Sequence, residues 1–260
     1  VDEAPPTFIN QSANYNENQL AEAVIHTITA SDDIGVTSFK FANGTNTSSD
    51  GYFTVDNSGK IRITQEGVKS IYNNYELKST SFTYNIKAYD AVGKEKEATI
   101  TLSVNNINEA PVLDTIKTAS VIDQATGNAI STNLSGTLSS YDQDSANSLT
   151  YSIIGQTDSS KNGFDKEVIG TYGTLYLNSS TGAYEYIVNQ SVVDALKIDN
   201  PVEVFTLKVT DNGTLFDTTA FVINIKGAND TPTMNSTTQS SALVEDGNIT
   251  SSITITPSDL

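Results

Sequence analysis

One short acidic motif that ends in proline recurs three times along this chain of 260 residues. Its copies are Asp2-Glu3-Ala4-Pro5, Asn108-Glu109-Ala110-Pro111 and Asn229-Asp230-Thr231-Pro232. The intervals from Pro5 to Pro111 and from Pro111 to Pro232 are 106 and 121 residues, and either is long enough to bury its own core. The repeat predicts one domain at 1–110, a second at 111–231, and the start of a third repeat or an ordered tail at 232–260.

Further acidic residues recur at similar distances after each copy of the motif. Glu17, Asp123 and Glu245 follow its proline by 12 or 13 residues, and Asp32, Asp142 and Asp259 follow it by 27 or 31. Carboxylates held close together repel one another unless a cation lies among them, and calcium prefers oxygen ligands. The recurrence therefore predicts calcium ions bound between consecutive domains.

Composition excludes several classes of function. The chain has 31 Asp and Glu against 14 Lys and Arg, a formal charge of −17, so it lacks the basic face that nucleic-acid binding requires. The sequence contains no apolar run of about 18 residues, so it does not predict direct membrane insertion. It contains no cysteine, so no disulfide can stabilise the domains. A solvated acidic surface gives the same net charge, and this alternative explanation of the acids stays open.

Apolar residues alternate with polar ones, which is typical of strands that bury one face. The clearest runs are 83–88 with 98–104, and 205–209 with 221–225. Earlier in each interval two strands flank a glycine-bearing turn, at 52–63 and at 174–186. Only 191–196 is typical of a helix. The sequence predicts an all-β chain of tandem Greek-key β-sandwiches in an elongated array.

The first interval resembles a cadherin-type domain. The resemblance rests on Glu17-Asn18, Ala30-Ser31-Asp32-Asp33, Asn74-Tyr75-Glu76, Ala88-Tyr89-Asp90 and the closing 106–111. The second interval resembles the VCBS-type cadherin-like repeats of RTX-type adhesins and other large bacterial surface proteins. Its supports include Ser135-Gly136-Thr137-Leu138, Tyr141-Asp142-Gln143-Asp144, Val209-Thr210-Asp211 and Gly227-Ala228-Asn229-Asp230.

The cadherin resemblance implies a set of calcium ligands around each linker. For the middle linker it implies Glu17 and Glu76 from the upstream domain, Asn106, Asn108 and Glu109 from the linker, and Asp142, Asp144 and Asp211 from the downstream domain. The linker is one residue shorter than the usual cadherin form, and Asn106 stands where aspartate is common. Because fewer charges bind calcium more weakly, we expect one or two ions there rather than three.

The two outer linkers have only part of their ligand sets in this chain. The resemblance implies Asp2, Glu3, Asp32, Asp33 and Asp90 for the upstream one, and Asp123, Asn229, Asp230 and Asp259 for the downstream one. Asp199 is a weak counterpart of Glu76 in the second domain. For any single aspartate at a β-turn, the alternative is that it only caps its own backbone.

Together these features predict calcium-dependent extender modules of a secreted bacterial surface adhesin, monomeric and extracellular, which support cell adhesion or biofilm attachment. Weak calcium sites, with dissociation constants of roughly 0.1–1 mM, fill outside the cell. One alternative is a module that binds cell-surface polysaccharide or a like domain, with Tyr172, Tyr176, Tyr184 and Tyr186 as an exposed aromatic platform. Another is an accessory domain of a cell-surface hydrolase.

No enzymatic activity is predicted. His26, the only histidine, lies on an alternating strand where we expect it to face solvent, and no Gly-x-Ser-x-Gly motif is present. Paired carboxylates that cleave glycosides are formally available in any chain with 31 acids.

Overall fold

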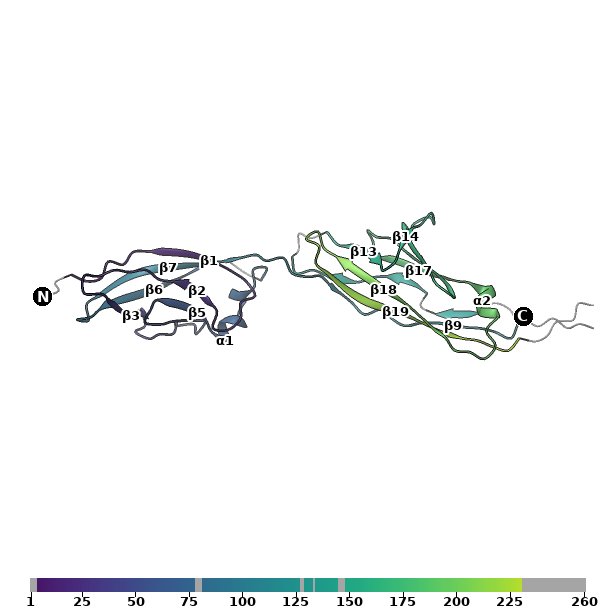
Figure 1. Ribbon diagram of the computed structural model, residues 1–260, viewed down its shortest axis with the longest axis horizontal. Helices are drawn as coiled ribbons and strands as arrows, with labels where there is room; N and C mark the ends of the chain where they lie inside the picture. The colour runs from purple at the N-terminus through teal and green to yellow at the C-terminus, as the bar shows by residue number, and fades with distance from the viewer. Residues whose placement is uncertain (1–3, 78–80, 127–128, 133, 145–147, 231–260) are drawn as a thin grey trace, which may run out of the picture. The chain divides into compact units, whose positions relative to one another are not determined.

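The computed structural model describes residues 4–77, 81–126, 129–132, 134–144 and 148–230 (Figure 1). The chain divides into two compact units, with the boundary between Asn108 and Glu109. Both units are built of strands with short helical segments, which confirms the all-β prediction. Within the described residues no helix is long and apolar enough to span a membrane. The predicted sites Asp2, Glu3 and Asp259 lie outside these residues.

The first unit contains β1 (Gln11–Asn16), β2 (Val24–Thr27), β3 (Val36–Phe41), β4 (Phe53–Val55), β5 (Lys60–Ile63), α1 (Gln65–Val68), the 3-10 helix η1 (Ile71–Asn73), β6 (Ser81–Asp90) and β7 (Glu95–Asn105). Its sheets have the orders β1-β7-β6-β3 and β2-β5-β4. One core lies between them, with Phe53, Ile61, Ile86 and Ile100 fully buried. The predicted hairpin and the predicted strand pair are both confirmed.

The second unit contains β8 (Val112–Leu113), β9 (Ala119–Ile122), β10 (Ile130–Thr132), β11 (Ser135–Thr137), β12 (Ser140–Tyr141), β13 (Thr150–Ile153), β14 (Thr157–Asp158), β15 (Lys166–Ile169), β16 (Gly173–Leu177), β17 (Ala183–Val188), α2 (Gln190–Asp194), β18 (Val202–Thr210) and β19 (Phe216–Lys226). Its main sheets have the orders β10-β9-β19-β18-β13 and β11-β17-β16-β15-β14, and β8 pairs with β12. Alternate residues of β18 and β19, such as Leu207 and Phe221, fill its core.

An early strand pairs in parallel with the last strand in both units. In the first unit β1 runs parallel to β7 and ends with Asn16 opposite Asn105. In the second unit β9 runs parallel to β19 and ends with Ile122 opposite Lys226. This shared register decides where the next acidic residue of each unit lies.

Two short helical segments of the first unit were not predicted from the sequence. The Thr64 hydroxyl caps α1 by accepting from the N–H of Gly67, and the Ser70 hydroxyl caps η1 by accepting from that of Tyr72. A Cβ added at Gly67 would lie 2.4 Å from the carbonyl oxygen of Tyr52, so the close approach requires glycine. Because glycine has a low helix propensity, the sequence around Gly67 does not predict α1.

The predicted alternative of an exposed aromatic platform is wrong. Tyr184 and Tyr186 point inward from β17 and lie in the core, because period two places them on the face that also holds Leu175 and Leu177 of β16. Tyr172 and Tyr176 are half-buried. The four rings therefore do not share one exposed surface.

Stability should fall at alkaline pH because both units bury tyrosines. Burial raises the pKa of Tyr15, Tyr84 and Tyr186, and hydrogen bonds to Asp50 and Glu203 raise it further for Tyr84 and Tyr186. A raised pKa in the folded state gives stability that is complete below about pH 10, the pKa of unfolded tyrosine, and is lost as the pH rises further. We expect urea denaturation to give a smaller free energy of unfolding at about pH 11 than at about pH 8. Tyr84→Phe should reduce this pH dependence, and an unchanged dependence would contradict the explanation.

Candidate metal-binding sites

Glu17 directly follows β1 and is almost completely buried, with 2% of its surface exposed. Its N–H continues the β1–β7 pairing by donating to the carbonyl oxygen of Asn105. Its Oε2 accepts from the N–H of Tyr75 at 2.6 Å, and its Oε1 accepts from the N–H of Ile107 at 2.8 Å. One buried carboxylate therefore holds both the segment after η1 and the chain that leaves β7.

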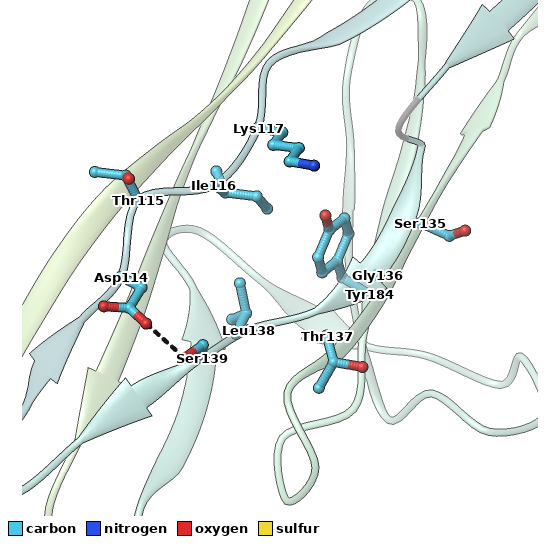
Figure 2. Close-up of a pocket in the computed structure, with 10 residues that line it drawn as sticks. All are labelled: Asp114, Thr115, Ile116, Lys117, Ser135, Gly136, Thr137, Leu138, Ser139 and Tyr184. Carbon is cyan, nitrogen blue, oxygen red and sulfur yellow. Dashed lines mark hydrogen bonds between the residues drawn. The ribbon is translucent and has the colours of Figure 1, made fainter.

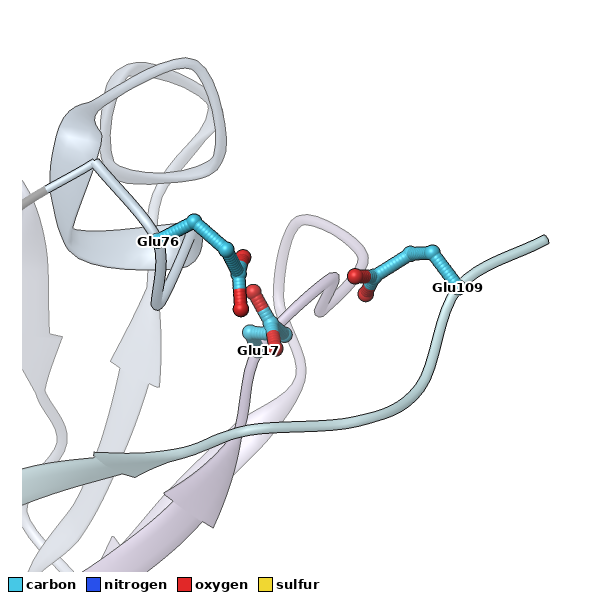
Figure 3. Close-up of side chains that lie close together, drawn as sticks. All are labelled: Glu17, Glu76 and Glu109. Carbon is cyan, nitrogen blue, oxygen red and sulfur yellow. The ribbon is translucent and has the colours of Figure 1, made fainter. Parts of the chain in front are cut away.

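The Glu17 carboxylate lies in a group of three (Figure 3). Glu76 comes from the segment after η1, and Glu109 directly follows the last residue of the first unit. Each of the three offers one oxygen, and these oxygens lie within 4.8 Å of one another. Two oxygens that bind one calcium ion at about 2.4 Å are at most about 4.8 Å apart. The spacing and the oxygen-only donor set therefore fit calcium.

Electrostatics favour a cation at this end of the first unit. Among the described residues no lysine or arginine forms an ion pair with Glu17. A buried carboxylate beside the Glu76 carboxylate is repelled by it in a medium that screens charge poorly. A bound cation converts that repulsion into attraction.

The second unit begins with a related arrangement around Asp144, which is 7% exposed. Its Oδ2 accepts from the N–H of Glu109 at 2.8 Å, and its own N–H donates to Asp142 Oδ1 at 2.9 Å. Asp211 is buried after β18, and its N–H donates to the carbonyl oxygen of Leu215. Among the described residues the oxygens of Asp142, Asp144 and Asp211 do not form a group as tight as that around Glu17.

Asp123 is the structural counterpart of Glu17 in the second unit. It directly follows β9, its N–H donates to the carbonyl oxygen of Lys226, and it is 3% exposed. Its Oδ2 accepts from the N–H of Ala228 at 3.2 Å, two residues after the paired Lys226, as Glu17 accepts from Ile107 two residues after Asn105. The common register of the two parallel strand pairs produces this match.

The remaining predicted ligands have simpler surroundings. Asp90 is buried at the end of β6, where its Oδ1 accepts from the N–H groups of Val92 and Lys94 at 2.9 Å each. Asp32 Oδ1 accepts from the N–H of Ile34. Both therefore cap turns, as the alternative explanation of these acids requires. The exposed ones are Asp33, Asn106, Asn108, Asn229 and Asp199, and Asp230 is half-buried.

The buried side chain of Asn73 supports the site, and the sequence analysis missed it. Its Oδ1 accepts from the N–H of Gln19, and its Nδ2 donates to the carbonyl oxygen of the same residue. Its own carbonyl accepts from the N–H of Asn18. Asn73 thus fixes the chain just after Glu17 against η1. Neither spacing nor periodicity marks such a residue.

His26 is half-buried in β2 rather than facing solvent, and its Nε2 lies 3.3 Å from Gln11 Oε1. Burial lowers the pKa of the imidazole.

Solved cadherin structures are similar in fold to this chain. No protein-family model and no curated protein matches its sequence. Drosophila N-cadherin EC1-4 aligns over 87% of this chain and 51% of its own length, at 14% identity and a TM-score of 0.50. Human CDH23 EC21-23 aligns over 98% of this chain and 80% of its own, at 19% identity and a TM-score of 0.45. The chain spans about half the length of the Drosophila structure, and the likeness identifies a cadherin-like fold.

Proposed function

We propose that the chain consists of calcium-dependent extender modules of a secreted bacterial surface adhesin, at 1–110 and 111–231. Calcium bound where one module leads into the next stiffens the linker, so that the array holds a distal binding domain away from the cell and supports adhesion or biofilm attachment. The modules act by binding and by mechanical support, without catalysis.

The observation that carries this proposal is the buried Glu17 carboxylate, which lies beside other carboxylates while it holds a linker amide. On the other side of Asn108, the buried Asp144 holds the N–H of Glu109. The linker backbone is thus hydrogen-bonded to a carboxylate of either unit. A cation bound by these carboxylates would order the linker as well as the unit ends.

Thermodynamic linkage gives the mechanism. An ion that binds only the ordered form stabilises it by about 2.7 kcal/mol per site at a hundredfold excess over its dissociation constant. Glu17, Glu76 and Glu109 are the first candidate ligands, with Asp142, Asp144 and Asp211 from the second unit. Sites of weak affinity, with dissociation constants of roughly 0.1–1 mM, would fill outside the cell and empty in cytosol.

Calorimetric titration of the metal-stripped chain with calcium tests the proposal. We expect saturable binding, and the Asp142→Ala, Asp144→Ala double variant should lose at least one site. Asp158→Ala, which removes an exposed carboxylate paired with Lys166, is the control and should bind as the parent does. Absence of binding up to about 10 mM calcium, well above the extracellular range, would refute the proposal.

Solution scattering then tests the stiffening separately. The chain should have a longer maximum dimension and a narrower distribution of dimensions in calcium than in chelator. Superimposable profiles from a chain that binds calcium would mean that the ion stabilises each unit without ordering the linker.

A further inference from the structure

The second unit contains a pocket that the calcium sites do not use (Figure 2). Its volume is about 340 Å³, near the lower end of the range for small-molecule sites, about 300–1,000 Å³. One wall is the segment 114–117 between β8 and β9, and the other is 135–139, which includes β11. Tyr184 of β17 lies between these walls.

The Tyr184 hydroxyl points toward Ile116 and Lys117 in this pocket (Figure 2). The side chain is 7% exposed, and its ring packs against Phe221 in the core with the centroids 5.3 Å apart. Gly136 pairs with Tyr184 across β11 and β17, and a Cβ added at this glycine would lie 2.7 Å from the hydroxyl oxygen. Because Gly136 has no side chain, the hydroxyl end of Tyr184 fits against the edge strand β11.

The Tyr184 hydroxyl makes no hydrogen bond with any residue that the structure describes, whereas the hydroxyl of Tyr186 on the same strand donates to Glu203. Burial raises the pKa of Tyr184, so the group keeps its proton and can donate. The hydroxyl faces the pocket, where it can donate to a ligand. An oxygen acceptor in the pocket would satisfy it.

The rim carries both signs of charge. Asp114 accepts from the Ser139 hydroxyl, and Lys117 forms no ion pair within the described part of the chain. Ile116 and Leu138 add apolar surface between the two charges. An anionic ligand would face the Asp114 carboxylate, and a cationic one would face the Lys117 ammonium. A neutral ligand with hydroxyl groups and an apolar face suits all of these groups.

We propose that this pocket binds one neutral hexopyranose unit of a polysaccharide. The Tyr184 hydroxyl donates to a sugar oxygen, Lys117 donates to another, and the Asp114 carboxylate accepts from a sugar hydroxyl. The C–H face of the ring packs on Ile116 and Leu138. This role is independent of calcium and goes beyond the extender function.

Saturation-transfer NMR tests the site with D-glucose, D-galactose, D-mannose and N-acetyl-D-glucosamine as probes, and with D-glucuronate and D-glucosamine as charged comparators. At least one neutral probe should bind, more tightly than either charged sugar. Tyr184→Phe keeps the ring and removes the hydrogen bond, so it should weaken binding about fivefold. Lys117→Ala, on the exposed rim, should also weaken it.

Tyr176→Phe is the matched control, since it removes the hydroxyl of a half-buried tyrosine on the neighbouring strand β16 and should leave binding unchanged. The proposal is overturned if no neutral probe gives saturation transfer, if a charged sugar binds more tightly than all neutral ones, or if Tyr184→Phe binds as Tyr176→Phe does.

Discussion

Removal of calcium by a chelator is expected to lower the melting temperature of the first unit by roughly 10–20 °C. This follows from about 2.7 kcal/mol for one site at hundredfold excess, and from a shift of about 4–8 °C per kcal/mol for a domain of this size. The physical cause is the buried Glu17 carboxylate beside Glu76, whose repulsion the ion removes. Scanning calorimetry of the full chain, with calcium and with chelator, measures the shift.

Glu17→Gln should abolish most of this calcium-dependent rise. The uncharged amide attracts the ion less, and its NH₂ group must face the N–H of Tyr75 or of Ile107, both of which now donate to the carboxylate. One buried donor therefore loses its acceptor, which costs about 1–3 kcal/mol even without calcium. In this variant the melting transition of the first unit should shift to a lower temperature than in the parent.

Glu66→Gln is the matched control for that experiment, because Glu66 lies exposed on α1 and forms an ion pair with Lys69 at 3.8 Å. Its free energy of unfolding should lie within about 0.5 kcal/mol of the parent's, and its melting temperature should show the full response to calcium. Equal calcium responses in the two variants would show that Glu17 does not contribute to the site.

Glu203→Ala is expected to reduce the free energy of unfolding of the second unit by about 3–5 kcal/mol. Glu203 is 9% exposed at the start of β18. Its Oε1 accepts from the N–H groups of Thr171 and Tyr172, and its Oε2 accepts from the Tyr186 hydroxyl. The variant leaves three donors without their acceptor: the buried Tyr186 hydroxyl and the partly buried N–H groups of Thr171 and Tyr172. An orphaned buried donor costs about 1–3 kcal/mol.

Urea denaturation of the full chain measures this loss, with Glu185→Ala as the control. Glu185 pairs with Lys161 at 3.3 Å near the surface, so its removal should cost less than about 1 kcal/mol. Tyr186→Phe removes only one donor and should fall between the two. A Glu203→Ala loss no greater than that of Glu185→Ala would mean that solvent replaces the missing acceptor.

Glu203 lies on the core face of β18, outside the alternating run that the sequence predicts. The alternating strand was predicted from Phe205, but the inward positions of β18 are Glu203, Phe205, Leu207 and Val209. In a strand every second side chain lies on the same face, so Glu203, two residues before Phe205, lies on the core face. A carboxylate on that face needs donors. Two of them lie in the loop after β15, about 30 residues earlier in the chain, and the third is Tyr186 of β17, so no local pattern indicates them.

Hairpins were predictable because their causes are local. Gly59 and Gly182 have φ values of 80° and 72°, a conformation that glycine adopts without penalty, and strands of alternating polarity flank them. The helix α1 was not predictable, since Gly67 lowers its propensity while contact with Tyr52 requires that glycine.

The sequence by itself determined the repeated units, the strands and the acidic residues that recur, because each depends on neighbours within a few positions. Tertiary structure decided which of those acids meet. Glu17 and Glu76 are far apart in the chain, and they come together only because β1 pairs in parallel with β7 and Asn73 fixes the next segment on η1. Tertiary structure also decided that the Tyr184 ring is buried while its hydroxyl reaches a pocket. This arrangement depends on Gly136, which lies opposite Tyr184 on the neighbouring strand β11.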